Sequence, residues 1–323
     1  MTLLRINNLN VIYKVEGKEI RAVKDVSLDV NSRDAIGIVG ESGSGKSTLA
    51  MAILRLLPHG VSETTGEIIF DGVDILKMDE EQLRQIRWKD IAVVFQKSMN
   101  SLSPVHKIGY QMKDIYRVHR PEARDEEIGK RILELFELVN LSPRVYDLYP
   151  HELSGGMMQR VCIALSLIYY PRLLILDEAT TALDVVTQGQ ILEEIMELEE
   201  RLNLTRIMIT HDVSVVASTC NRVAVMYAGY LLESGYVKDV LIKPKHPYTQ
   251  GLLSSFPSLT GERKDLRGIP GFLPDLGVEH KGCIFADRCR KAMEKCFIEE
   301  PRMVEFPGHW KVACHLVGGG WDD

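Results

Sequence analysis

The stretch Gly40-Glu41-Ser42-Gly43-Ser44-Gly45-Lys46-Ser47 decides the fold of this chain. Four residues separate its first glycine from a Gly-Lys-Ser ending, which is the Walker A pattern of a phosphate-binding loop. The apolar run Ala35–Val39 before it predicts a buried strand, and Thr48–Leu54 after it predicts a helix. Strand, glycine loop and helix in this order direct backbone N–H groups at phosphate. The sequence therefore predicts a P-loop NTPase core of the α/β class.

The residue types in this loop each suit one task. Close approach to phosphate leaves no space for side chains, which explains the glycines. Lys46 is expected to reach the β- and γ-phosphates of ATP, and the Ser47 hydroxyl to bind Mg²⁺. We predict that the loop binds ATP through Gly40, Ser42, Gly43, Ser44, Gly45, Lys46, Ser47 and Thr48.

A second element, Leu173–Asp177 followed by Glu178, combines an apolar strand with two carboxylates at its end. The uninterrupted apolar run is typical of a central parallel strand that is covered on both faces. Ligands bind at the carboxyl ends of the strands in open α/β sheets. We therefore expect Asp177 to join the Mg²⁺ shell and Glu178 to orient and activate the attacking water.

Between these two elements lies a third, Leu153-Ser154-Gly155-Gly156. A serine and glycine amides at the start of a helix form an anion site. We expect this site to face outward and to complete the ATP site of a second subunit. The chain would then work as half of a nucleotide sandwich.

With these three elements in order, the chain resembles the nucleotide-binding subunit of an ABC transporter. The resemblance makes Leu153–Gly156 the signature motif and Thr181–Asp184 the D-loop with its Asp184. It makes Gln96 the Q-loop glutamine, which contacts the metal and the water, and His211 the switch histidine near the γ-phosphate. It also implies that Tyr13 stacks on adenine. The implied catalytic residues are Glu178, His211 and Gln96, and the implied Mg²⁺ ligands are Ser47, Gln96 and Asp177.

Four positions depart from the commonest wording of the family motifs: Met157, Met158, Ala179 and Thr181. None of them removes a group that the mechanism requires. We therefore expect both Walker motifs and the signature to be competent for hydrolysis.

The 323 residues, of which 45% are hydrophobic, allow one large core and a smaller appendage. We predict an ABC ATP-binding domain over residues 1–255, with an antiparallel β layer over Leu3–Val30 and a helical subdomain at about 97–160. Residues 256–323 are expected to form a small cysteine-rich extension. Within the helical subdomain, the segment Ile128–Asn140 shows apolar residues at helical spacing, namely Ile132, Leu133, Leu135, Phe136 and Val139.

Three phrases near the C-terminus, His246–Leu253, Ile269–Leu276 and Gly282–Cys289, resemble the ATPases of oligopeptide and dipeptide importers. This resemblance implies an ATPase that powers peptide import, with two ATP sandwiched between two nucleotide-binding subunits. It also implies two membrane permease subunits, a homologous but distinct second nucleotide-binding subunit, and an extracellular solute-binding protein that acts indirectly. Related importers carry oligosaccharides or nickel, so these substrates stay open.

Four of the six cysteines fall in the extension: Cys283, Cys289, Cys296 and Cys314. Four thiolates in a segment with little core of its own suit a metal centre. The family resemblance points to a [4Fe-4S] cluster with a structural role. Zinc bound with His309 or His315, free thiols and redox sensing stay open as alternatives. Cys162 and Cys220 lie in apolar stretches and are expected to be inert.

Charge and hydropathy limit which kinds of partner and location are expected for this chain. The net charge of −6, with scattered Lys and Arg, provides no basic field for nucleic acid. Apolar segments such as Val161–Tyr170 are shorter than the ~20 residues of a membrane span, and the N-terminus lacks a signal-peptide core. We expect a cytoplasmic chain held at the membrane through the permeases. Two rivals remain, a soluble ABC ATPase acting on nucleic acid or ribosomes and a redox module that ATP only regulates.

Overall fold

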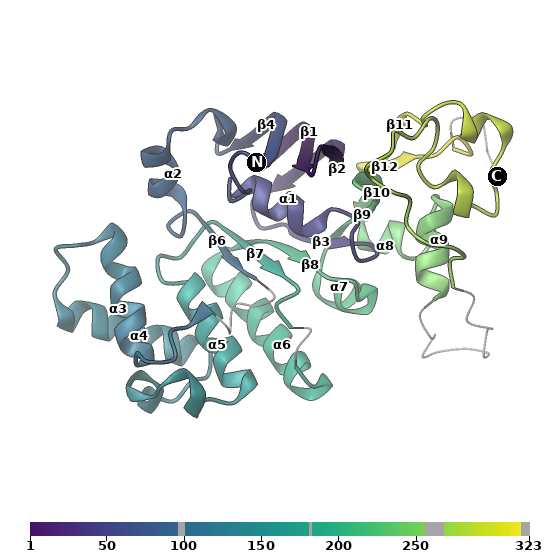
Figure 1. Ribbon diagram of the computed structural model, residues 1–323. Coiled ribbons are helices and arrows are strands. Elements are labelled where there is room, and N and C mark those ends of the chain that lie inside the picture. Colours follow the sequence, from purple (N-terminus) through teal and green to yellow (C-terminus); the bar gives the residue numbers. More distant parts are fainter. Residues whose placement is uncertain (96–100, 181–182, 256–267, 318–323) are drawn as a thin grey trace. The chain divides into compact units, whose positions relative to one another are not determined.

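The computed structural model describes residues 1–95, 101–180, 183–255 and 268–317 (Figure 1). The chain divides into two compact units. The P-loop unit comprises Thr2–Val30, Ala35–Leu76 and Ile209–Asp323, and the signature unit comprises Met1, Asn31–Asp34 and Lys77–Met208. Each unit carries part of the predicted site, with the phosphate loop in the first and the signature motif in the second.

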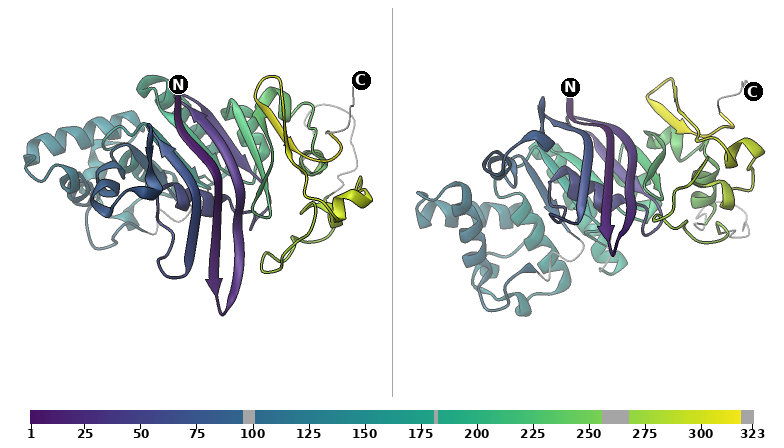
Figure 2. Two further views of the ribbon diagram at one scale, coloured as in Figure 1. Left: turned by 90° about the horizontal axis from the view of Figure 1, so that it is seen from above. Right: turned by 45° about the horizontal axis from the view of Figure 1, so that its top comes forward.

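A four-stranded sheet in the order β2-β1-β4-β5 contains the N-terminal strands of the P-loop unit. β1 runs antiparallel to β4, and β4 runs antiparallel to β5. The long strands β1 and β2 run side by side in both views of Figure 2. The predicted antiparallel layer is confirmed. Its strands are β1 (Thr2–Val15), β2 (Lys18–Asn31), β4 (Ser62–Phe70) and β5 (Val73–Asp74).

The pairing of β1 with β4 contains an irregularity, because its register shifts between Asn7 and Asn10. The buried side chains of β1 change phase at this point, from Leu4 and Ile6 to Leu9. An inserted residue in one strand produces this change, since side chains alternate between the two faces of a strand. The bulge therefore keeps apolar side chains facing the core along the whole strand.

A second series of strands in the P-loop unit has the order β11-β12-β10-β9-β3. β3 pairs with β9 in parallel, whereas the other neighbours are antiparallel. The first two strands of this order come from the C-terminal extension, which the sequence patterns did not indicate. The bounds are β3 (Ala35–Val39), β9 (Arg222–Tyr227), β10 (Tyr230–Tyr236), β11 (Met303–Phe306) and β12 (Trp310–Ala313).

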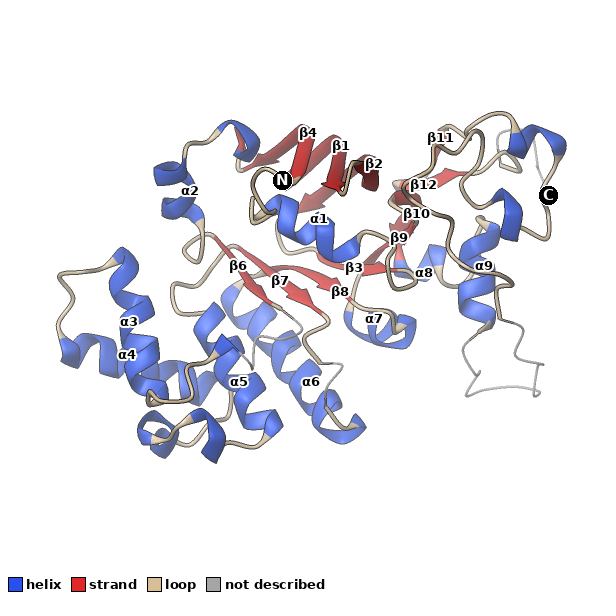
Figure 3. Ribbon diagram, viewed as in Figure 1, coloured by secondary structure: helices blue, strands red, loops and turns tan. Residues whose placement is uncertain are grey.

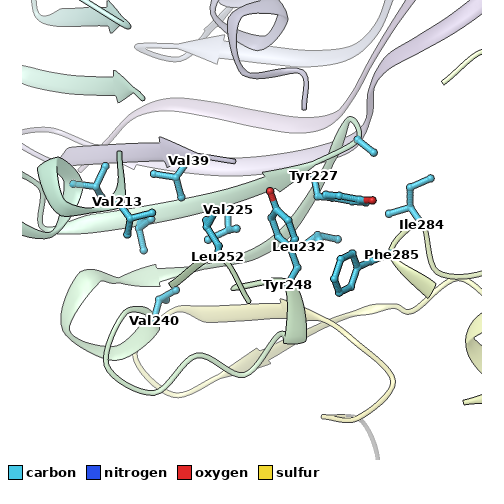
Figure 4. Close-up of a cluster of buried hydrophobic side chains, with 13 residues drawn as sticks. Val39, Val213, Val225, Tyr227, Leu232, Val240, Tyr248, Leu252, Ile284 and Phe285 are labelled. Carbon is cyan, nitrogen blue, oxygen red and sulfur yellow. The ribbon is translucent and has the colours of Figure 1, made fainter. Parts of the chain in front are cut away.

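Buried hydrophobic side chains hold the C-terminal segment against the rest of the P-loop unit. Figure 4 shows Phe285 and Ile284 beside Tyr227 and Tyr248, in a cluster that also contains Val39 of β3. Fully burying one such side chain contributes about 1.5–3 kcal/mol. The helices of this unit are α1 (Lys46–Ile53), α7 (Val213–Thr219), α8 (Val237–Val240) and α9 (Pro247–Ser254). Residues 268–302 are mainly loop and include the short 3-10 helices η5 (Ala286–Arg288) and η6 (Glu294–Phe297) (Figure 3).

Three strands of the signature unit lie in the order β8-β7-β6. They are β6 (Ile91–Val94), β7 (Leu173–Asp177) and β8 (Thr205–Ile209). β6 and β7 pair in parallel, and every residue of β7 is buried. The prediction of a buried parallel strand that ends in Asp177 is confirmed.

The α-helices in the described part of the signature unit are α2 (Glu80–Ile86), α3 (Ile108–His119), α4 (Asp125–Leu138), α5 (Gly155–Ser166) and α6 (Val185–Leu202). α4 begins with three acidic residues, which its positive N-terminal dipole favours. The predicted helix is confirmed, and its buried face contains Ile132, Leu135 and Phe136. Leu133 is 42% exposed, because successive helical residues point to different faces.

Within the described ranges, no helix combines the length and the apolarity that crossing a bilayer requires. The 18-residue helix α6, for example, carries five glutamates.

Candidate nucleotide site

The phosphate loop joins β3 to α1, and two of its glycines lie where no other residue fits. Gly45 caps α1 with φ 95°, and a Cβ added there would lie 2.3 Å from the carbonyl oxygen of Ala22. Gly40 has φ 152°, and its Cβ would lie 2.0 Å from the carbonyl oxygen of Met226. Both obstacles are backbone atoms, so a side chain would displace a neighbouring strand. The glycines of the motif are therefore required by packing as well as by phosphate.

Lys46 lies folded into this loop and is 5% exposed. Its Nζ donates hydrogen bonds to the carbonyl oxygens of Gly40 at 2.9 Å and Glu41 at 2.8 Å, and to Ser44 Oγ at 3.2 Å. Phosphate oxygens are stronger acceptors than these neutral groups, because charge shortens and strengthens a hydrogen bond. The loop thus holds the ammonium group among weak acceptors that a phosphate can replace.

The remaining residues of the predicted ATP site differ in exposure. Ser42, Gly43 and Ser47 are exposed, whereas Thr48 is half-buried in α1. The Ser47 hydroxyl is therefore accessible in the first turn of the helix that follows the loop. Tyr13 is half-buried in β1, opposite Ser62 of β4.

His211 belongs to the same unit as the loop. The N–H of Thr210 donates to the carbonyl oxygen of Ile38 at 3.2 Å, so the residue before His211 lies beside β3, the strand that leads to Gly40. His211 is exposed, and α7 begins just after it with Asp212 as its N-cap. The structure therefore brings the start of the phosphate loop and the predicted switch histidine to the same end of β3.

In the signature unit, Asp177 and Glu178 lie at the carboxyl end of β7. Asp177 is 5% exposed and Glu178 is half-buried. Glu178 has φ 49°, in the left-handed region that costs a residue with a side chain about 1–2 kcal/mol. Backbone strain of this kind concentrates at functional sites, where the fold must re-aim a side chain. The positive φ of Glu178 agrees with the prediction that this residue orients and activates the attacking water.

The signature motif forms the exposed start of α5. Ser154 is its N-cap, and its Oγ accepts a hydrogen bond from the N–H of Met157 at 3.3 Å. Ser154 and Gly155 are exposed, whereas Leu153 is 8% exposed and anchors the turn. Met157 differs from the commonest family residue at this position, but the N-cap bond is unaffected because only the backbone N–H of Met157 takes part.

The D-loop residue Asp184 caps α6 next to the signature. Its carboxylate accepts from Thr187 N–H at 2.9 Å and Thr187 Oγ1 at 2.6 Å, and these bonds lower the pKa of Asp184. Thr187 also lies against Gly156, whose added Cβ would be 2.8 Å from Thr187 Cγ2. Gly156 of the predicted signature, at the start of α5, and the Asp184 cap of α6 are therefore neighbours through Thr187.

Two features of this face were missed by the sequence interpretation. Val185 and Val186, in the first turn of α6, are 84% and 70% exposed. Arg160 of α5 donates from Nε and Nη2 to the carboxylate of Glu194 of α6, at 2.9 and 2.8 Å. Their exposure could have been predicted from the sequence, because the two adjacent valines lie outside the helical period of the buried apolar residues of α6. The ion pair joins positions far apart in sequence and has no local signal.

Gln96, Thr181 and Ala182 lie outside the described residues. Their predicted roles in the Q-loop and the D-loop stay predictions.

Burial is the largest cause of a raised pKa at the Cys283 thiol, and smaller contributions come from the charges of Cys296, Cys314 and Cys289. Burial raises the pKa of Cys283 to about 11, and burial also raises the pKa values of Cys289 and Cys314. The N–H of Cys283 donates to the carbonyl oxygen of Cys296 at 2.7 Å. However, no group of three or more His, Cys, Asp or Glu in the part of the chain that the structure describes has an arrangement that could hold a metal ion.

The two histidines considered as zinc ligands have other neighbours. His309 is exposed and lies 3.9 Å from the carboxylate of Glu305, and His315 Nε2 lies 2.7 Å from the carbonyl oxygen of Glu299. Cys162 is buried, with its pKa raised to about 12 by burial, as expected for an inert thiol.

Comparison with known proteins identifies two matching family models. The ABC transporter model matches residues 23–181, and the oligopeptide/dipeptide transporter C-terminal region matches residues 232–296. A probable peptide ABC transporter ATP-binding protein of Sinorhizobium fredii is 44% identical over 97% of this chain and 94% of its own length. A dipeptide transport ATP-binding protein of Caldanaerobacter subterraneus is 40% identical over 98% of both chains. An oligopeptide transport ATP-binding protein of Bacillus subtilis is 43% identical over 93% of this chain and 85% of its own.

Solved structures support the same assignment. A dimeric bacterial ABC transporter cassette has a TM-score of 0.65 and 30% identity, and the match covers 72% of this chain and 98% of that one. A dimeric post-hydrolysis state of that ATP-binding cassette, with ADP and phosphate bound, matches equally well. Together with the phosphate loop and the signature helix, these findings show that the chain is an ATPase that belongs to the ATP-binding subunits of ABC transporters, in the oligopeptide and dipeptide group.

Proposed function

We propose that this chain hydrolyses ATP to drive the import of dipeptides or oligopeptides. The observation that carries the proposal is that one chain contains both a phosphate loop that holds Lys46 and a signature motif at an exposed helix start. Its relatives along nearly the full length are named for peptides, which favours peptides over oligosaccharides or nickel. The matched C-terminal region favours a transporter over an ATPase acting on nucleic acid or ribosomes.

The roles of individual residues follow from their chemistry. Lys46 neutralises the β- and γ-phosphates, and Tyr13 stacks on adenine. Ser47 and Asp177, together with Gln96, supply the oxygen ligands that Mg²⁺ prefers, and the metal supplies charge neutralisation at the phosphates. Glu178 accepts a proton from the attacking water, and His211 contacts the γ-phosphate.

The exposed signature implies a partner subunit. Leu153 to Gly156 complete the partner's ATP site, while the partner's signature completes the site of this chain. We propose that Asp184 and the D-loop lie in the same interface. The partner is a homologous but distinct subunit, so the working pair is a heterodimer.

The remaining partners place the chain at the cytoplasmic face of the cell membrane. Two permease subunits bind it there, and closure of the ATP sandwich opens their pathway. An extracellular solute-binding protein delivers the peptide. Residues 1–255 contain the ATPase, with the helical subdomain at about 97–160, and residues 256–323 form the extension.

For the extension we propose a [4Fe-4S] cluster bound by Cys283, Cys289, Cys296 and Cys314. The support is the donor set, since four cysteines are what such clusters take, and the charges of the other three thiols contribute to the raised pKa of Cys283. A bound metal stabilises thiolates and so reverses the effect of burial. Anaerobic purification with iron, sulfide and zinc analysis tests this proposal: four irons per chain support it, and stoichiometric zinc or metal-free thiols contradict it.

Peptide import is tested by reconstituting the chain with its permeases and solute-binding protein in vesicles. Uptake of a labelled dipeptide or oligopeptide should require ATP on the side of this chain and should stop when Lys46 is replaced by Ala. ATP-dependent uptake of nickel or an oligosaccharide, with no peptide uptake, would reject the peptide assignment.

A further inference from the structure

Glu41, the second residue of the phosphate loop, is held by contacts at three of its groups. Its backbone N–H donates to the hydroxyl of Tyr248 at 3.0 Å. Its carbonyl oxygen accepts from Lys46 Nζ at 2.8 Å, and its carboxylate accepts from Arg288 Nη1 at 2.8 Å. Two of these partners lie more than two hundred residues further along the chain, in the region that matches the C-terminal transporter model.

Arg288 is fixed in the orientation that meets Glu41. Its side chain is 8% exposed, its Nε donates to the carbonyl oxygen of Pro270 at 2.7 Å, and its Nη1 also reaches the Tyr227 hydroxyl at 3.3 Å. Burial opposes the charge of Arg288, but the bonds to Glu41 and Tyr227 outweigh it and raise the pKa of the guanidinium. A partly buried, charge-assisted pair of this kind is stronger than an exposed surface ion pair.

Tyr248 is equally constrained. It is fully buried near the start of α9, with its ring 4.7 Å from that of Tyr227 and 5.3 Å from that of Phe285 (Figure 4). Burial raises the pKa of its hydroxyl, which therefore stays protonated. The aromatic cluster thus holds a neutral hydroxyl against the backbone of the phosphate loop.

Leu273 of the same region lies near the loop. A Cβ added to Gly43 would be 3.5 Å from Leu273 Cδ1. Three side chains of the C-terminal region, Tyr248, Leu273 and Arg288, therefore border the phosphate loop.

We infer that Tyr248 and Arg288 are positioning residues for ATP binding. Their hydrogen bonds hold the backbone and the carboxylate of Glu41 in place, and the Glu41 carbonyl oxygen in turn accepts a hydrogen bond from the Lys46 ammonium group. A preorganised loop binds phosphate more tightly, because less ordering remains to be done on binding. The C-terminal region thus sets the affinity of this chain for nucleotide. This inference rests on the assignment of the loop as the ATP phosphate site.

The test compares the Kd for Mg²⁺-ATP by calorimetry in the full chain and its variants. Arg288→Met and Glu41→Gln should each raise Kd about tenfold, which corresponds to about 1.4 kcal/mol. The double variant should be no weaker than either single one, because both remove the same pair. Arg288→Lys should restore part of the affinity, and Tyr248→Phe should raise Kd about threefold, a smaller effect expected from loss of a neutral hydrogen bond. Turnover at saturating ATP should fall less than twofold in these variants, a bound that separates positioning from catalysis.

Arg290→Met is the matched control, since Arg290 is exposed two residues further along and the charge change is the same. Its Kd should match the parent chain. Unchanged Kd in the Arg288 and Glu41 variants, or fully additive effects in the double variant, would overturn the inference. If Arg288→Met does not fold, Glu41→Gln and Tyr248→Phe decide the question by the same criterion. Failure of the parent chain to bind ATP would instead reject the nucleotide site itself.

Discussion

The phosphate loop and the signature helix start are both built from serine, glycine and backbone N–H groups, but they differ in how far this chain completes them. In the loop, Ser44 is fully buried, Lys46 is 5% exposed, and the ammonium group has three acceptors from the loop itself. In the signature, Ser154 and Gly155 are exposed, and the N-cap bond is a local one at 3.3 Å. The first region is held together within one chain, whereas the second leaves its groups exposed.

Substitutions in the two regions should therefore act at different ATP sites. A substitution in the phosphate loop or at Glu178 should lower turnover at the ATP site of the chain that carries it. A substitution in the signature should lower turnover at the ATP site of the partner.

Replacing Glu178 by Gln should reduce ATP turnover by about a thousandfold, because it removes the group that accepts the proton of the attacking water. The Kd for ATP should change little, since the amide keeps the size of the carboxylate. Steady-state hydrolysis and equilibrium binding measure the two effects. Turnover close to that of the parent chain would reject Glu178 as the base.

Replacing Gly45 by Ala should destabilise the chain by about 3 kcal/mol, since the new Cβ meets the Ala22 carbonyl oxygen at 2.3 Å. Gly60 is the matched control, because it also has positive φ, at 79°, but nothing within 4 Å of its Cβ position. Gly60→Ala should cost only about 1 kcal/mol of backbone strain. Urea unfolding compares the two, and equal losses would show that loop packing is not the cause.

Replacing Ser154 by Ala should act in trans. In a pair where this chain carries Glu178→Gln, only the partner's site turns over, and adding Ser154→Ala to this chain should lower that remaining rate about tenfold to hundredfold. Asp79→Ala is the control, because Asp79 caps α2 in the same unit and its loss costs a similar ~1 kcal/mol of stability. An unchanged partner site would contradict the outward-facing role of the signature.

Replacing Val185 and Val186 by Ser should weaken pairing about tenfold, since exposed apolar side chains next to the D-loop are expected to be covered by the partner. The stability of the separate subunit should hardly change. Ile242→Ser, at a position 71% exposed in the other unit, should leave pairing intact. Sedimentation with Mg²⁺-ATP and a hydrolysis-blocked pair measures the change, and equal pairing in all variants would exclude the valines from the interface.

Local sequence patterns predicted the features that depend on local spacing. The loop before Lys46, the buried strand β7 and the helical face of α4 all follow from glycine placement or apolar period. The exposure of Leu133 was not anticipated, because a short apolar run does not define its own helical phase.

Long-range contacts could not be predicted in the same way. The bonds from Glu41 to Tyr248 and Arg288 join distant segments, and no periodicity encodes them. The same holds for the pairing of β12 with β10, which brings the extension into a sheet of the P-loop unit. The four cysteines cluster in sequence, but a metal-binding arrangement does not follow from spacing alone, and the described residues contain none.

The central claim is that the exposed signature serves the phosphate loop of a second subunit, so that one subunit alone cannot hydrolyse ATP. ATPase rate per molecule, measured over a dilution series with the mass of the species verified at each concentration, tests it most directly. We expect the ATPase rate per molecule to fall to background as pairs of subunits dissociate. A constant rate per molecule in a verified monomer would contradict it.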